Sequence, residues 1–138
     1  MTGPLYVETS AVLRTVLEIG ASPEIETRLN ETERLLTSRL SPVESARAFL
    51  RLRRLGELSE TAVADAESAV RSVWTRCEIL ELSGPICDLA ERVAPASLLR
   101  AIDALHLASF VVARRHIEDL ELLTVDNRLL AAVEAGGI

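Results

Sequence analysis

The sequence predicts an α/β fold with three layers, in which a mostly parallel central sheet lies between helices. Two observations lead to this prediction. Short apolar runs rich in β-forming residues alternate along the chain with longer segments whose apolar residues recur at helical spacing. Hydrophobic residues make up 49% of the 138 residues, whereas aromatic residues make up 3%, so aliphatic side chains must fill the core. No repeat or linker divides the sequence, and we expect a single domain over residues 1–138.

The first part of the chain is predicted to contain two strands and four helices. The apolar run at 4–8 lies between a Gly-Pro pair and two hydroxyl residues, which is typical of a short strand. Ser22 is the expected N-cap of the second helix. Ser41 and Glu44 match a capping box that opens the third helix, and Gly56 is a natural end for it. The predicted strands are 4–8 and 35–37, and the predicted helices are 10–18, 22–29, 42–55 and 59–76.

The second part of the chain continues the alternation of strands and helices. The segment 100–116 is apolar on nearly all sides, which predicts a buried helix. Pro95 interrupts the chain before it, and Gly136 and Gly137 are expected to stop the last helix. The predicted strands are 77–82 and 120–126, and the predicted helices are 84–94, 100–116 and 127–135.

Four carboxylates interrupt segments that otherwise have the composition of a core: Glu8, Glu44, Asp103 and Asp126. A buried carboxylate is unfavourable unless it is paired, protonated or bound to a cation. Glu8 and Asp126 each come at the end of a predicted strand, and ligand sites of α/β sheets lie outside the carboxyl ends of the strands. Because oxygen ligands favour Mg²⁺ or Mn²⁺ over zinc or copper, the pattern predicts a divalent-metal site suited to phosphodiester hydrolysis.

Each of these acids also has a structural explanation. Glu8 and Asp126 would serve as acids at helix N-termini, and Glu44 is fully accounted for by the capping box. Asp103 lies in the most apolar helix, where pairing with Arg100 or with the histidine three residues further on is one structural role. We therefore expect Asp103 to be the acid most clearly kept for function.

Four segments in order, VETSAVL, SPVESARAF, LRAIDALHLAS and LLTVDNRL, resemble the PIN-domain family, and within it the VapC-type toxins of bacterial toxin–antitoxin pairs. The resemblance covers essentially the whole chain. It implies Mg²⁺- or Mn²⁺-dependent hydrolysis of RNA to products with a 5′-phosphate and a 3′-hydroxyl, and a VapB-type antitoxin as partner. It assigns catalytic and metal-binding roles to Glu8, Glu44, Asp103 and Asp126, and supporting roles to the hydroxyls of Thr9, Ser10 and Thr124.

The first acid departs from the family pattern, which usually has Asp where this chain has Glu8. The extra methylene matters because Mg²⁺ requires near-ideal octahedral geometry at about 2.0–2.1 Å. Glu8 could bind the ion directly, bind it through water, or weaken the site. A second hypothesis is therefore a catalytically weakened module that binds RNA or a partner without cutting. Receiver domains and haloacid-dehalogenase phosphatases are disfavoured, because both need Asp after the first strand and receivers also need a Lys, which the chain lacks.

Several cationic side chains are candidates for contacts with RNA or with an acidic antitoxin segment. Arg47, Arg51 and Arg54 share one face of the helix 42–55, which would otherwise be a solvated face. Arg100 precedes Asp103 by three residues and could orient it or contact substrate. His106 is expected to be a core histidine with a satisfied hydrogen bond.

Composition sets further expectations. The net charge of −6 argues against a general nucleic-acid coat protein, but bound cations would offset it at a nuclease site. Cys77 and Cys87 do not form a CxxC motif and are expected to be free thiols. Without a membrane-spanning run or a signal peptide, we expect a cytoplasmic protein. The apolar excess and the family resemblance favour a homodimer.

Overall fold

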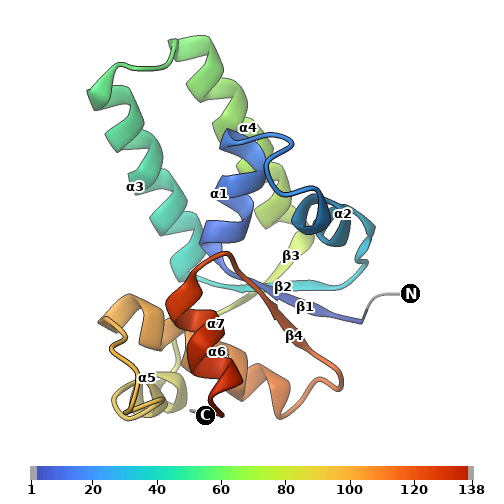
Figure 1. Cartoon of the computed structure of the whole chain (residues 1–138), viewed down its shortest axis with the longest axis vertical. Coiled ribbons are helices and arrows are strands. Elements are labelled where there is room, and N and C mark those ends of the chain that lie inside the picture. The colour runs from blue at the N-terminus through green and yellow to red at the C-terminus, as the bar shows by residue number, and fades with distance from the viewer. Residues whose placement is uncertain (1–2, 137–138) are drawn as a thin grey trace.

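The computed structural model describes residues 3–136, which form a parallel sheet with helices on both faces (Figure 1). The four-stranded sheet has the order β3-β2-β1-β4, and every neighbouring pair is parallel. The strands are β1 (Leu5–Val7), β2 (Leu35–Ser38), β3 (Cys77–Leu80) and β4 (Glu121–Leu123). The helices are α1 (Thr9–Leu17), α2 (Pro23–Glu31), α3 (Leu40–Leu55), α4 (Glu60–Arg76), α5 (Gly84–Ala90), α6 (Ala101–Arg114) and α7 (Asn127–Glu134). The predicted three-layer α/β class is confirmed.

The sheet separates two hydrophobic clusters. Successive side chains of a strand point to opposite faces, so Leu5 and Val7 pack with α1 to α4 while Tyr6 packs with α6 and α7. Figure 1 shows the same division, with α1, α2, α3 and α4 on one side of the sheet and α5, α6 and α7 on the other. The central strand β1 therefore contributes to both clusters and carries the chain directly to the carboxyl edge of the sheet.

Helices α3 and α4 form a long antiparallel hairpin that extends away from the sheet (Figure 1). Helix α3 ends at Gly56, whose φ of 68° is left-handed and suits glycine. Arg53 on α3 pairs with Glu60 and Glu67 on α4. The predicted end of this helix is thus confirmed, and charged groups join the two arms of the hairpin.

The predicted capping box at the start of α3 is wrong. The helix begins at Leu40, whose N–H donates to the Ser38 hydroxyl at 3.0 Å, so Ser41 already lies within the first turn. The Ser41 hydroxyl instead contacts the hydroxyls of Thr9 and Thr37 at 3.0 and 2.7 Å. Glu44 therefore does not serve in a capping box, the structural role predicted for it from the sequence.

Several expected boundaries differ in the second half of the chain: β3 ends at Leu80 rather than at 82, α6 spans Ala101–Arg114 rather than 100–116, and β4 spans Glu121–Leu123 rather than 120–126. Helix α5 ends at Ala90 rather than at 94, and the chain continues in a turn in which the Arg92 N–H donates to the Leu89 carbonyl oxygen three residues back. Ala94, with a φ of 48°, follows this turn. The last helix is followed by Gly136 with a φ of 67°, while Gly137 lies outside the described residues.

Two expectations from composition can be compared with the structure. Cys77 and Cys87 are both free, as predicted. Between residues 3 and 136 no helix combines the length and the apolarity that crossing a bilayer would require.

Candidate active site

The site is built at the carboxyl ends of the adjacent strands β1 and β4. Glu8 directly follows β1, is 5% exposed, and is the N-cap residue of α1. Thr124 follows β4, and its hydroxyl donates to Glu8 Oε1 at 2.6 Å. The two strands pair in parallel from Leu5–Glu121 to Val7–Leu123, which brings these ends together. Glu8 and the end of β4 are therefore neighbours at this edge of the sheet.

The Glu8 carboxylate is fixed by donors on both of its oxygens. The Ser10 hydroxyl and the Thr124 hydroxyl both donate to Oε1, and the Ser10 backbone N–H donates to Oε2 at 3.1 Å. The contact with the Ser10 backbone is an N-cap bond, so the structural alternative for Glu8 is present. Two hydroxyls and one backbone N–H thus satisfy both oxygens of this buried carboxyl group.

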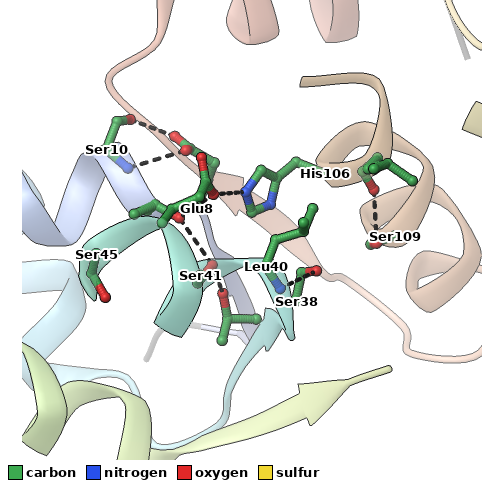
Figure 2. A network of polar contacts seen from close by, with 12 residues as sticks. Glu8, Ser10, Ser38, Leu40, Ser41, Ser45, His106 and Ser109 are labelled. Carbon is green, nitrogen blue, oxygen red and sulfur yellow. Dashed lines mark hydrogen bonds and ion pairs between the residues drawn. The ribbon is translucent and has the colours of Figure 1, made fainter. Parts of the chain in front are cut away.

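Glu44 reaches the same site from α3. Its Oε1 accepts hydrogen bonds from the Thr9 hydroxyl at 2.7 Å and from His106 Nε2 at 2.5 Å. Burial alone would raise the pKa of Glu44, but the hydrogen bonds from His106 and Thr9 and the charge of His106 outweigh it and lower that pKa. In Figure 2 the His106 ring approaches from α6 and faces the same cluster as Glu8 and Ser10.

A compact group of metal-ligating side chains results from these contacts. Among residues 3–136, Glu8, Glu44 and His106 each offer a ligand atom, and these atoms lie within 4.8 Å of one another. His106 is 1% exposed, and its Nδ1 contacts the Tyr6 hydroxyl at 2.8 Å. The prediction of a core histidine with a satisfied hydrogen bond is confirmed. Its contact with Glu44, 62 residues away in sequence, was not predicted.

Asp103 and Asp126 lie outside this group of three. Asp103 is 7% exposed in the first turn of α6, where it accepts from the Arg100 N–H at 3.4 Å and lies 3.7 Å from Arg100 Nε. Asp126 caps α7, because its Oδ1 accepts from the N–H groups of Arg128 and Leu129 at 2.8 and 3.4 Å. The structural alternatives are thus present for both acids, with Arg100 rather than His106 as the neighbour of Asp103.

The hydroxyls named from the sequence divide between the two glutamates. Thr9 contacts Glu44, whereas Ser10 and Thr124 contact Glu8. Behind them, Thr37 donates to the Val7 carbonyl oxygen and contacts Ser41, so a buried layer of hydroxyls supports the carboxylates. Thr37 and Ser41 were missed, although hydroxyls at the end of an apolar strand were a usable signal.

The candidate RNA- or partner-binding arginines are exposed. Arg47, Arg51 and Arg54 all face solvent on α3, while Arg53 is occupied by its ion pairs with α4. The Arg100 side chain is 77% exposed beside Asp103. The face of α3 that these three arginines share is therefore exposed to solvent, and its contact with RNA or an antitoxin stays a prediction.

Carboxylates held by hydroxyls at the carboxyl edge of a parallel sheet define an α/β protein with a candidate cation site. The chain is 31% identical over 137 residues to Ribonuclease VapC47 of Mycobacterium tuberculosis, covering 96% of this chain and 92% of that protein. It is 32% identical over 133 residues to Ribonuclease VapC35 of the same species, covering 95% and 90%. No family model matches the chain. The chain belongs to the VapC ribonuclease family, which confirms the resemblance seen in the sequence.

Solved structures agree on the fold. PAE2754 from Pyrobaculum aerophilum superposes with a TM-score of 0.66 at 24% identity, over 94% of this chain and 79% of that one. The Sarcin-Ricin loop cleaving toxin VapC20 of M. tuberculosis gives a TM-score of 0.64 at 16% identity, over 93% and 94%. VapBC2 from Rickettsia felis, bound to a DNA fragment from its promoter, gives 0.58 at 12% identity, over 89% and 99%.

Proposed function

We propose that this chain is the toxin of a VapBC-type pair and hydrolyses RNA phosphodiester bonds in the cytoplasm with Mg²⁺ or Mn²⁺. Membership of a ribonuclease family supports the reaction class. The observation that carries the proposal is the pair of glutamates, Glu8 and Glu44, held side by side at the carboxyl edge of the sheet. Two neighbouring carboxylates repel each other in the absence of a cation, so their convergence favours a bound metal.

The donor set fits a hard divalent ion. In Glu44 both hydrogen bonds converge on Oε1, which leaves Oε2 to face a cation. In Glu8 two hydroxyls converge on Oε1, and Oε2 accepts one backbone N–H. Carboxylate oxygens with lone pairs to spare are ligands that Mg²⁺ and Mn²⁺ accept. We assign Asp103 and Asp126 to the same site, directly or through water, because the family pattern places acids there.

The protein side of the reaction consists of positioning and electrostatics. A bound cation supplies an activated water molecule and neutralises charge on the phosphoryl group. Thr9, Ser10 and Thr124 hold the carboxylates in place before substrate arrives, so little reorganisation is required. Despite its longer side chain, Glu8 offers a ligand atom within 4.8 Å of those of Glu44 and His106, which supports an intact site over a weakened one.

The exposed arginines are assigned to the partners. Arg47, Arg51 and Arg54 on α3, together with Arg100 beside Asp103, are proposed to contact RNA phosphates or an acidic segment of a VapB-type antitoxin, and their exposure supports this. We also propose that the toxin is a homodimer, which light scattering of the purified chain would test by its mass.

The test is cleavage of a structured RNA by the antitoxin-free protein with Mg²⁺ or Mn²⁺. We expect Glu44→Gln and Asp103→Asn each to lower the rate about 10²-fold or more, because each removes a carboxylate assigned to hold the cation that stabilises the reacting phosphate. The matched controls Glu24→Gln and Asp88→Asn alter exposed acids on α2 and α5 and should leave the rate unchanged.

Three results would contradict or redirect the proposal. Cleavage that survives a chelator would exclude the metal-dependent reaction. Cleavage that survives both site substitutions would exclude the assigned residues. A folded, metal-loaded protein that binds RNA without cutting it would favour the weakened binding module, and a gain of activity in Glu8→Asp would locate the cause.

A further inference from the structure

We propose that His106 is a positioning residue that orients Glu44 toward the cation, and that Tyr6 fixes its ring so that His106 does not itself bind the metal. This inference rests on the proposed metal site and concerns how that site is held. It also decides between two roles, because His106 lies close enough to Glu8 and Glu44 to be a direct ligand.

The contact between His106 and Glu44 determines where the imidazole carries a hydrogen. His106 Nε2 lies 2.5 Å from Glu44 Oε1. An ionised carboxylate only accepts hydrogen bonds, so Nε2 must be the donor. A nitrogen that carries a hydrogen has no lone pair for a metal, and His106 in this arrangement therefore acts on Glu44 and not on the cation.

Tyr6 holds the opposite side of the ring. Its hydroxyl lies 2.8 Å from His106 Nδ1, and the tyrosine is 0% exposed. The Tyr6 hydroxyl can either donate or accept, so this buried hydrogen bond holds the ring in place whichever group donates. The Tyr6 ring is packed edge-on against His106 and Phe110, with centroids 6.1 and 6.0 Å away. A flipped imidazole would lose both hydrogen bonds inside the core, which disfavours the flip.

The effect of this arrangement is to direct one oxygen of Glu44. Thr9 on α1 and His106 on α6 both donate hydrogen bonds to Glu44 Oε1. The carboxylate therefore cannot rotate without breaking both bonds. Helix α6 also carries Asp103 one turn before His106, so one rigid helix supplies an acid and the side chain that orients a second acid. Residues that orient metal ligands contribute about 10–100-fold to metal affinity.

The first test is Mn²⁺ binding by the full chain without RNA, measured by calorimetry. We expect His106→Leu to weaken Mn²⁺ affinity about 10–100-fold, and His106→Gln, whose amide retains a donor, to restore it to within about threefold of wild type. Tyr6→Phe removes only the hydroxyl and should weaken affinity less than His106→Leu. Thermal unfolding checks that each variant is folded. If His106→Leu does not fold, the Mn²⁺ affinities of Tyr6→Phe and His106→Gln still test the inference.

The second test measures which nitrogen of the His106 imidazole carries a hydrogen and whether either nitrogen binds the metal. Nitrogen NMR of the metal-free protein should show a hydrogen on His106 Nε2, and pulsed EPR of the Mn²⁺ complex should show no directly bonded histidine nitrogen. A bare Nε2, a Mn–nitrogen bond, or equal weakening by His106→Leu and His106→Gln would overturn the inference. A wild-type protein that binds no Mn²⁺ would instead refute the metal site, whatever the NMR result, and the positioning role would fall with it.

Discussion

At the residue scale, the indole of Trp74 shows how a polar atom is accommodated between α3 and α4. Trp74 is 8% exposed, and its Nε1–H donates to the Ser45 hydroxyl at 2.9 Å. Ser45 in turn donates to the Pro42 carbonyl oxygen at 3.1 Å. The pair joins the two helices just behind Glu44, and a buried indole N–H without a partner would be unfavourable.

We predict that Ser45→Ala lowers the free energy of unfolding by about 1–3 kcal/mol, because the Trp74 N–H loses its acceptor in a buried position. Denaturant titration followed by the fluorescence of the single tryptophan measures this. Ser72→Ala is the matched control, since Ser72 is exposed on α4 and bonds only within its helix. Equal effects of the two substitutions would show that the Trp74 contact is not significant.

The burial of Glu8 and Asp103 was predictable from the sequence, whereas the contacts of the candidate acids were not. Glu8, Glu44 and Asp103 were identified because acids in apolar segments are rare, and that signal is local. The partners of Glu44 were not predictable, because Thr9 and His106 reach it from distant segments of the chain. The sequence could not separate the two roles of Asp126, because a helix N-cap and a metal ligand at a strand end use the same residue type at the same place.

At the element scale, the α3–α4 hairpin depends on how α3 ends. Gly56 has a left-handed φ of 68°, and a β-carbon added there would meet no atom within 4 Å. The need for glycine is therefore conformational rather than steric. Gly84 at the start of α5 also has open space, but its φ is ordinary, which makes it a useful comparison.

We predict opposite effects for alanine at these two glycines. Gly56→Ala should destabilise the protein by about 1 kcal/mol, because alanine disfavours the left-handed conformation. Gly84→Ala should stabilise it by about 0.4–1 kcal/mol, because the unfolded chain loses freedom without strain in the helix. Denaturant midpoints of the two variants give the comparison. A Gly56→Ala variant as stable as wild type would contradict the conformational explanation.

Element boundaries were predictable where backbone chemistry decides them. The end of α3 at Gly56 and the start of α4 after Ser59 follow from glycine and N-cap preferences. The start of α3 was misassigned because Ser-Pro-Val-Glu has the form of a capping box, whereas Ser38 accepts the first N–H. The end of α5 was misplaced because the chain passes into a turn at Arg92, within a segment whose residues carry no helix-ending signal before Pro95.

At the scale of the whole molecule, the sheet joins two hydrophobic clusters that do not share a helix. Leu29 of α2 belongs to one cluster and Leu107 of α6 to the other, and both are fully or almost fully buried. Strands β1, β2 and β4 contribute side chains to both clusters. Loss of packing on either face should therefore lower the stability of the whole sheet.

We predict that Leu29→Ala and Leu107→Ala each lower the free energy of unfolding by about 2–5 kcal/mol through lost burial and a residual cavity. Leu98→Ala, at a side chain that is 93% exposed, should change it by less than about 0.5 kcal/mol. Trp74 lies in the cluster of Leu29, so its fluorescence and circular dichroism should shift together in both core variants. A fluorescence transition unchanged by Leu107→Ala would show that the two faces unfold separately.

The pairing of β1 with β4 has a consequence for the order in which the protein is made. The ribosome delivers Glu8 and Glu44 early, but the side chains that fix them, His106 and Thr124, arrive on α6 and after β4. A nascent chain that ends before α6 carries two glutamates and no assembled site. The candidate site is therefore assembled only once α6 and the end of β4 have been made, and a chain that stops before them lacks the groups that fix Glu8 and Glu44.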